Sequence, residues 1–218
     1  MPTHTPSPDN LPHTESGSAF DIRAREALIL GKPPRIAPLG PNEMGKEAVE
    51  SARALRKAAS APASDVVTEF TATMLRHPVL YQRYTELGVQ LFAGALSPRD
   101  RELIILRTGW LCKAPYEWGE HVKGGKRVGL TQEEIERVTK GSAAVGWDEH
   151  DRAILSAVEQ LRDDAMVSDE TWEVLARRLD ERQLIEIPIL VGQYQGLAYL
   201  QNALRLRLDG ENPGLSAR

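Results

Sequence analysis

Helical periodicity, bounded by helix start and stop signals, is the feature that most constrains how this chain can fold. From about residue 47 onward, apolar residues recur at the three- and four-residue spacing of helices packed against a core. The alternating patterns and hairpin turns that indicate β-strands do not occur in the sequence. The sequence therefore predicts an all-α fold, with helices near 47–60, 65–75, 78–93, 98–113, 115–128, 132–140, 148–164, 169–178 and 181–207.

Residues at the predicted helix boundaries support several of these assignments. Ser97 precedes a proline, which is the pattern of an N-cap followed by proline in the first turn. The segment TQEE at 131–134 has the spacing of a capping box, and Gly129 and Gly141 stand where helices commonly end. Pro188 is expected to interrupt the last and longest helix.

The N-terminal part of the chain has a different composition. Residues 1–18 are rich in Pro, Ser, Thr and His and predict a disordered tail. A short helix is expected over 20–30, and four prolines within 31–41 predict an extended arm on the surface. We therefore divide the chain into the tail, a helix-and-arm segment at 19–46, and a single all-α domain at 47–218.

Composition excludes several classes of function. The net charge of −4 argues against a nucleic-acid-binding protein, which would carry a basic surface. The sequence has no apolar run of about 18 residues and no signal-peptide pattern, so we expect no membrane span and a cytoplasmic location. The single cysteine, Cys112, suits a reducing compartment.

A short internal sequence repeat suggests two related helical units. The segment RELI at 101–104 is similar to RQLI at 182–185, and the sequences on either side also correspond. At this alignment, neutral residues of the second unit stand opposite Glu102, Glu117 and His121. These ionisable groups would then belong to the first unit alone, which favours a functional role for them.

Glu117 and His121 are the first candidate functional pair. They lie four residues apart on a predicted helix, so their side chains share one face and can touch. Burying such groups costs several kcal/mol unless they are paired, so a core-like segment rarely keeps them without a use. The alternative is an ordinary surface pair, which contributes about 0.2–0.5 kcal/mol.

Three motifs carry a family resemblance. They are LSPRDREL at 96–103, YEWGEH at 116–121 and GLTQEEI at 129–135. Together they resemble the carboxymuconolactone decarboxylase family, which includes the alkylhydroperoxidase D-like proteins. The resemblance is strongest over 65–140, and the arm and the C-terminal helix also look like longer members. It implies an alkylhydroperoxidase D-like helical bundle that assembles as a homo-oligomer, a trimer or a hexamer.

The motif of the peroxidase branch is only half present. In that branch a glutamate on one helix is followed by Cys-x-x-Cys-x-x-x-His on the next, and the spacing places Glu102 and His121 on the glutamate and the histidine. Ala114 and Glu117 stand where the two cysteines would be. A dithiol peroxidase needs one thiolate to attack and another to resolve the product, so we do not expect this activity. Cys112 lies outside the motif and is interpreted as a small buried side chain.

Resemblance to the decarboxylase branch implies a cofactor-independent proton-transfer site. In that branch a γ-lactone carboxylate loses CO₂, and the resulting enolate must be stabilised and protonated. His121 is the candidate acid/base, because imidazole exchanges protons near neutral pH. Glu102 and Glu117 are its candidate orienting partners.

The remaining candidate residues surround this histidine in the sequence. Tyr116 is a candidate donor to a developing oxyanion, Arg101 a candidate ligand for a substrate carboxylate, and Trp118 a candidate pocket wall, although packing or solvated roles suit all three. The decarboxylases tend to carry arginine just before the histidine, where this chain has Glu120. The expected substrate is therefore a small cyclic lactone or carbonyl carboxylate, and the reaction a decarboxylation or a related isomerisation, dehydration or hydrolysis.

Two other functions remain open from the sequence. The two carboxylates and the histidine could bind a divalent metal ion, although paired Glu-x-x-His motifs are missing. The chain could also be a non-catalytic helical binding or regulatory module. His77 is expected to cap a helix and His150 to be exposed. The polar tips of Gln193, Tyr194 and Tyr199 on the apolar helix at 181–207 are expected to line a cavity or to face another subunit, and an interface is favoured.

Overall fold

The computed structural model describes residues 20–58 and 60–218, so the tail predicted at 1–18 lies outside the described residues. Within these ranges the chain contains helices and no strand, which confirms the all-α prediction. The helices are α1 (Ile22–Leu30), α2 (Lys46–Ala58), α3 (Glu69–Met74), α4 (Pro78–Phe92), α5 (Pro98–Leu111), α6 (Pro115–Arg127), α7 (Gln132–Lys140), α8 (Glu149–Asp164), α9 (Asp169–Ala176), α10 (Glu181–Leu204) and the short 3₁₀ helix η1 (Gly214–Ser216).

The helix boundaries follow the predicted capping chemistry. Ser97 caps α5 by accepting a hydrogen bond from the backbone N–H of Asp100, and a proline occupies the first turn. Thr131 and Glu134 form the predicted capping box at the start of α7, and Gly141 ends that helix with φ of +84°. His77 caps α4, as predicted, by accepting from the N–H of Leu80. Local sequence therefore defines where these helices begin and end.

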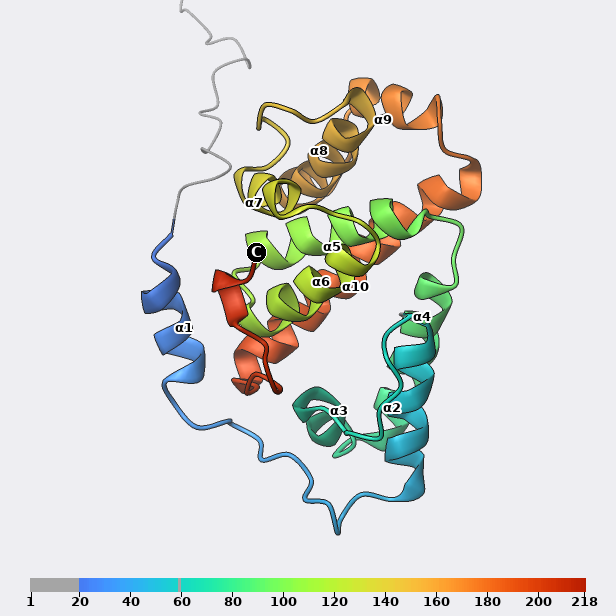
Figure 1. Cartoon of the computed structure of the whole chain (residues 1–218). Helices are drawn as coiled ribbons and strands as arrows, with labels where there is room; N and C mark the ends of the chain where they lie inside the picture. Colours follow the sequence, from blue (N-terminus) through green and yellow to red (C-terminus); the bar gives the residue numbers. More distant parts are fainter. Residues whose placement is uncertain (1–19, 59) are drawn as a thin grey trace, which may run out of the picture.

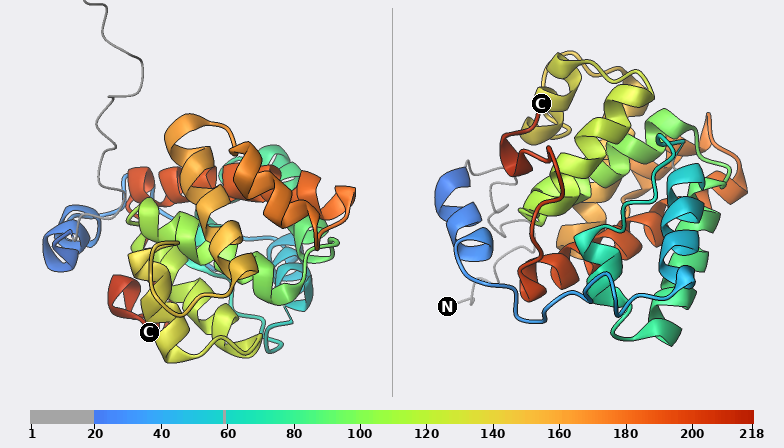
Figure 2. Two further views of the ribbon diagram at one scale, coloured as in Figure 1. Left: turned by 90° about the horizontal axis from the view of Figure 1, so that it is seen from above. Right: turned by 60° about the horizontal axis from the view of Figure 1, so that its bottom comes forward.

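Helix α5 forms the centre of the structure. It packs against α6, α7, α8 and α10, and Figures 1 and 2 show it enclosed by these helices. Leu103, Ile104, Ile105 and Leu106 have no exposed surface, so all sides of this turn are buried. A helix that is apolar on every side is stable only as a core element. The motif residues on α5 are consequently held at the buried centre of the molecule.

The N-terminal helices form a second layer beside this core. Helix α2 packs against α4, with α3 close by, and Figure 1 shows this layer on the opposite side of the molecule from α1. The arm between α1 and α2 has no helix or strand, as predicted, and crosses the lower edge in Figure 1. Backbone N–H groups of Arg35 and Leu39 donate to carbonyls of Leu204 and Ala72, which fixes the arm to the end of α10 and to α3.

Helix α10 differs from the prediction. It continues through Pro188 for 24 residues, so the predicted interruption is wrong. Proline removes one backbone hydrogen bond and costs about 3 kcal/mol in a helix interior. Here Leu184 and Ile187 before it, and Leu190 and Val191 after it, are buried against the core. Packing of both halves onto the same core thus outweighs the local cost.

The two copies of the internal sequence repeat do not place their matched residues at equivalent positions in the two helices. Arg101 is the fourth residue of α5, whereas Arg182, its match, is the second residue of α10. Arg101 is accordingly buried while Arg182 is exposed. None of the helices in the described part of the chain has the length and apolar character needed to cross a membrane.

Candidate active site

A cavity of about 220 Å³ lies between α6 and the N-terminal layer. At ~30 Å³ for each water molecule it has room for about seven, which corresponds to a small organic ligand. The wall residues come from α2, α4, α5, α6 and the segment 61–71: Ala52, Leu55, Arg56, Ala61, Thr68, Phe70, Thr71, Phe92, Glu102, Tyr116, Glu120, His121, Gly124 and Arg127. Of the six candidate site residues named from the sequence, Glu102, Tyr116 and His121 line it, and Glu117, Arg101 and Trp118 do not.

Glu102 and His121 form a direct pair at the cavity wall. The distance between His121 Nδ1 and Glu102 Oε2 is 2.9 Å, and side-chain exposure is 15% for the histidine and 4% for the glutamate. The Phe92 ring lies nearly parallel to the imidazole at 6.4 Å, and Tyr194 packs edge-on at 4.9 Å. Because a carboxylate accepts hydrogen bonds, this contact favours the tautomer that carries its proton on Nδ1.

Gly124 makes room for this pair. It lies three residues after His121 on α6, and a Cβ built on it would stand 2.8 Å from Glu102 Oε2. Contacts that short do not occur at real Cβ atoms, so the carboxylate could not stay in place beside an alanine. The glycine thus permits the close approach of the Glu102 carboxylate to the backbone of α6.

Glu117 is placed differently from the sequence expectation. Its side chain is not among the hydrogen-bond partners of His121, and neither carboxylate oxygen has a hydrogen-bond partner in the described residues. It points into the core beside Gly109, where an added Cβ would lie 3.3 Å from its Oε1. Complete burial raises the pKa of Glu117 well above its usual value. The i,i+4 spacing permits a contact between Glu117 and His121, but the Glu117 side chain is directed into the core instead.

Tyr116 lines the cavity, but its hydroxyl is already engaged. The phenol O–H donates to the carboxylate of Asp209, and the Tyr116 carbonyl accepts from Asn212 Nδ2 at 3.0 Å. Burial and the neighbouring Asp209 raise the pKa of Tyr116 well above its usual value. The proton expected to reach an oxyanion is therefore directed to Asp209. An isolated aspartate after the last helix gave no sequence signal for this contact.

Arg101 and Trp118 have structural roles that correct their assignment to substrate binding. The Arg101 guanidinium donates to the carbonyl of Phe92 at 3.0 Å and lies 4.8 Å from the centre of its ring. It therefore holds the aromatic residue that faces His121. The Trp118 side chain is fully buried, and its indole N–H donates to the Ala217 carbonyl at 3.1 Å. Each side chain is held by protein partners away from the cavity.

Several cavity residues were not singled out from the sequence. On α6 these are Glu120, Gly124 and Arg127, which follow the candidate Tyr116 at spacings of four, four and three, so that all four lie on one face of the helix. This periodicity was visible in the sequence. The opposite wall, which includes Arg56, gave no such signal because it comes from a different layer of the fold.

The prediction that His150 is exposed is wrong. The residue is buried, and its Nε2 lies 3.3 Å from Asp100 Oδ1 between α8 and α5. Burial alone would raise the pKa of Asp100, but the neighbouring His150 and Ser97 side chains outweigh it and lower that pKa. The charged sequence around His150 suggested solvent exposure, whereas the helix turns this side chain toward a buried acid.

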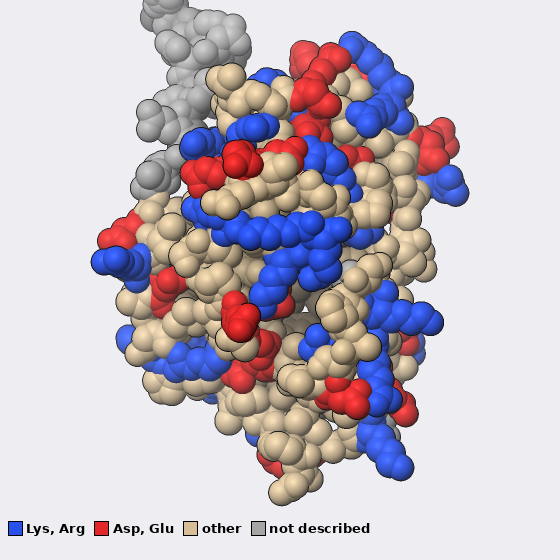
Figure 3. All heavy atoms as spheres, viewed as in Figure 1, with Lys and Arg blue, Asp and Glu red and all other residues tan. Residues whose placement is uncertain are grey.

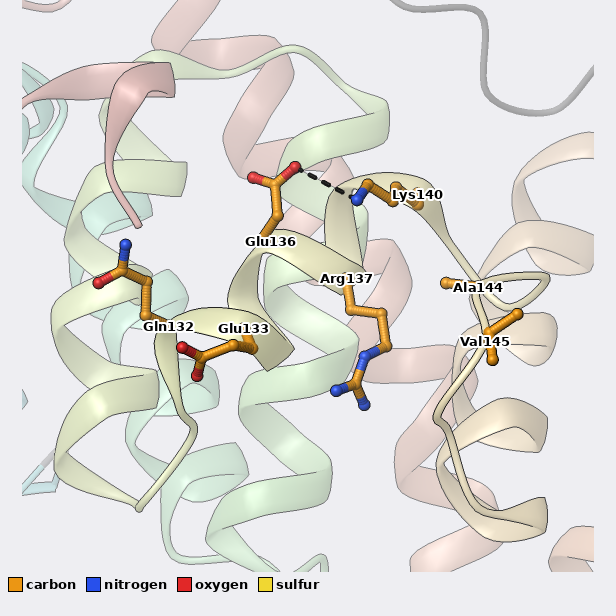
Figure 4. A pocket seen from close by; sticks show the side chains of 7 residues that line it. All are labelled: Gln132, Glu133, Glu136, Arg137, Lys140, Ala144 and Val145. Carbon is orange, nitrogen blue, oxygen red and sulfur yellow. Dashed lines mark ion pairs between the residues drawn. The ribbon is translucent and has the colours of Figure 1, made fainter.

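A larger hollow of about 510 Å³ lies along α7 and the loop after it (Figure 4). Its wall residues are Gln132, Glu133, Glu136, Arg137, Lys140, Ala144 and Val145, and none of them is buried. The Lys140–Glu136 ion pair drawn there spans 3.7 Å. Without a desolvated or strongly placed polar group, this hollow has no evident catalytic chemistry.

The geometry gives no support to the metal alternative. Over residues 20–58 and 60–218, no group of three or more His, Cys, Asp and Glu side chains is placed to hold a metal ion. Glu117 is turned away from the Glu102–His121 pair. What remains in direct contact at this wall is one carboxylate, Glu102, and one imidazole, His121.

Fold and site together define an all-α protein with a carboxylate–imidazole pair at the wall of a small cavity. Residues 78–160, which run from α4 into α8 and include both members of the pair, match the model of the carboxymuconolactone decarboxylase family. This part of the chain is therefore similar to that family, as the sequence motifs indicated. No curated protein is significantly similar to the chain in sequence.

Solved structures with the same fold are distant in sequence. An alkylhydroperoxidase AhpD core protein from Ralstonia eutropha JMP134, an uncharacterized peroxidase-related protein, superposes with a TM-score of 0.69 at 14% identity over 83% of this chain and 95% of that one. A peroxidase-related protein from Silicibacter sp. TM1040 gives a TM-score of 0.67 at 16% identity over 83% and 96%. These similarities confirm the alkylhydroperoxidase D-like fold.

An enzyme is also among the similar structures. The debrominase Bmp8 superposes with a TM-score of 0.61 at 15% identity over 81% of this chain and 92% of its own. A cysteine-to-alanine variant of Bmp8 was solved in complex with 2,3,4-tribromopyrrole, with a TM-score of 0.64 at 16% identity over 82% and 93%. The fold thus accommodates a small ring compound in that protein.

Proposed function

We propose that this protein is a cofactor-independent acid/base enzyme that acts on a small cyclic lactone or carbonyl carboxylate. His121 transfers the proton, and Glu102 positions its ring. The observation that carries this proposal is the 2.9 Å contact between His121 Nδ1 and the buried Glu102 carboxylate at the wall of the cavity. Similarity to the family and the debrominase with the same fold are consistent with a catalytic role.

The pair supplies a base in its resting form. With the proton on Nδ1 directed to Glu102, the lone pair of Nε2 is free, and Nε2 has no hydrogen bond within the described part of the chain. Nε2 would take a proton from a carbon next to a carbonyl, and the electrons of the C–H bond would form the enolate. Return of the same proton to another atom gives an isomer. In a decarboxylation, a protonated imidazole would instead deliver its proton to the carbon that lost CO₂.

Thiol chemistry is the competing possibility for this fold. The sequence contains one cysteine, Cys112, and burial raises the pKa of its thiol to about 12. The thiol form is a poor nucleophile, and no second cysteine exists to resolve an oxidised one. The dithiol mechanism is therefore not part of the proposal.

Exchange of carbon-bound hydrogen for deuterium tests the proposal without knowledge of the full reaction. The protein would be incubated in D₂O with unsaturated five-membered lactones bearing a carboxylate, and NMR would follow deuterium uptake and product formation. We expect His121→Asn to lower the rate roughly 10²- to 10⁴-fold, as loss of a general acid/base does.

The matched control is His77→Asn. His77 lies outside the cavity wall and caps α4, a role that asparagine can also fill, so this variant should retain the wild-type rate. Equal rates in His121→Asn and wild type, with both proteins folded, would refute catalysis by His121. Binding of the lactones without exchange or product in the wild type would favour a non-catalytic binding module.

A further inference from the structure

The acidic residues of the cavity already have partners within the protein. Glu102 accepts from His121, while Glu120 accepts from Lys123 at 2.9 Å and from Asn212 at 3.0 Å. Their charges are thus partly balanced by neighbouring donors. An incoming ligand therefore does not need to supply a cation to this cavity.

The positive charges of the two arginines that line the cavity, Arg56 and Arg127, are not balanced in this way. Arg56 donates a single hydrogen bond, at 3.2 Å, to the carbonyl of Val66. Arg127 makes no hydrogen bond and no ion pair with the described residues. Neither guanidinium forms an ion pair with a carboxylate of the described residues, although each carries five N–H donors suited to one. An anionic group on a ligand would complete the site.

The position of Arg127 suits a ligand that also reaches His121. Arg127 is six residues further along α6, or ~9 Å along the helix axis, at 1.5 Å a residue. Long side chains on a helix lean toward its N-terminus, which brings this guanidinium back along the face that carries Gly124 and Glu120. Arg56 borders the cavity from α2 on the other side. Figure 3 shows Lys and Arg side chains gathered in a band across the middle of one face of the molecule.

We propose that Arg56 and Arg127 form a carboxylate-binding subsite that places the reacting carbon of the substrate beside His121. The inference rests on the proposed function for the reaction, but the binding that it predicts can be measured without turnover. It assigns substrate recognition to two arginines that line the cavity from different helices, α2 and α6, in place of Arg101, whose guanidinium is held at Phe92. They determine specificity and are not themselves proton-transfer groups.

A pair of small ring compounds tests the subsite. The probes are 2-furoate and its methyl ester, which differ in the negative charge, and calorimetry or ligand-observed NMR would give their dissociation constants. We expect the wild type to bind 2-furoate more tightly than the ester by about tenfold or more, because hydrogen bonds to charged groups are the stronger ones. Arg127→Gln and Arg56→Gln should each reduce this preference, and the double variant should abolish it.

Two control variants separate the subsite from general charge and from catalysis. Arg53→Gln removes a neighbouring α2 arginine that pairs with Asp65 and does not line the cavity, so the preference should remain. His121→Asn should also keep the preference, even if turnover is lost. Absence of furoate binding to the wild type, an equal affinity for the ester, or an unchanged preference in a folded double variant would each overturn the proposal. A preference for 2-furoate in a wild type that turns over none of the lactones would instead contradict only the proposed function.

Discussion

A carboxylic acid that is buried without a hydrogen-bond partner is tolerated in a folded protein only in its neutral form. Glu117 is such a group, because it is 1% exposed and burial raises its pKa well above the usual value. Glu102 is equally buried, but it faces His121 and so has a partner for its charge. Two glutamates on neighbouring helices therefore have different chemistry because only one of them meets the imidazole.

The neutral state of Glu117 predicts a pH dependence of stability. With a raised pKa in the folded protein, Glu117 stays protonated while the same residue in the unfolded chain ionises above its ordinary pKa. The free energy of unfolding should then fall as pH rises above that value, by up to about 1.4 kcal/mol for each pH unit. Glu117→Gln, which is neutral at every pH, should lack this decline and be more stable than wild type at pH 8.

Urea unfolding at several pH values would measure this effect. Other ionisable groups are common to both proteins, so the difference between wild type and Glu117→Gln isolates the contribution of Glu117. At pH 4 the two proteins should have similar stability. Parallel pH profiles for the two proteins would contradict the neutral state of this carboxyl group.

At the scale of the helix, α6 carries the site on one face and packs into the core with another. The face that lines the cavity includes Tyr116, Glu120, Gly124 and Arg127, and Trp118 belongs to the buried side. The catalytic proposal depends on how closely α5 and α6 approach, because Glu102 is on α5 and His121 is on α6. Gly124 allows this approach.

Gly124→Ala should therefore impair catalysis at the site while the protein still folds. The added methyl group would push the Glu102 carboxylate away from His121, so turnover should fall while the helical content is unchanged. Overpacking of this kind costs about 1–3 kcal/mol of stability. Gly88→Ala on α4 is the control, since nothing lies within 4 Å of an added Cβ there, and it should raise stability by roughly 0.5–1 kcal/mol. Full activity in Gly124→Ala would show that the pair does not need its present geometry.

On the scale of the whole molecule, α10 leaves large apolar residues uncovered. Ile185, Ile189 and Tyr199 are 66%, 49% and 59% exposed, and they follow one side of the helix with Gly192 and Gly196 between them. Exposed apolar surface of this kind marks interfaces in many proteins. Together with the family resemblance, it leads us to propose a homo-oligomer, a trimer or a hexamer, that is formed through this helix.

Molar mass measured by light scattering would test the assembly. The wild type should have three or six times the chain mass of 24.2 kDa, and Ile189→Arg should shift it toward the monomer because a buried unpaired charge is costly. Val145→Arg, at an exposed apolar residue in a distant loop, is the control and should leave the mass unchanged. A wild-type protein that is monomeric at all concentrations would refute the proposal.

Sequence alone determined which segments are helices and where most of them begin and end, because capping residues and apolar spacing act within a few residues of the chain. It also brought out Glu102 and His121, whose spacing matches a family motif. Only the tertiary structure decided that Glu102 and not Glu117 meets His121, that Tyr116 is engaged by Asp209, and that Arg101 is held at Phe92. Those contacts depend on the rotation and approach of helices far apart in the chain, which side-chain packing in the core sets and no local pattern encodes.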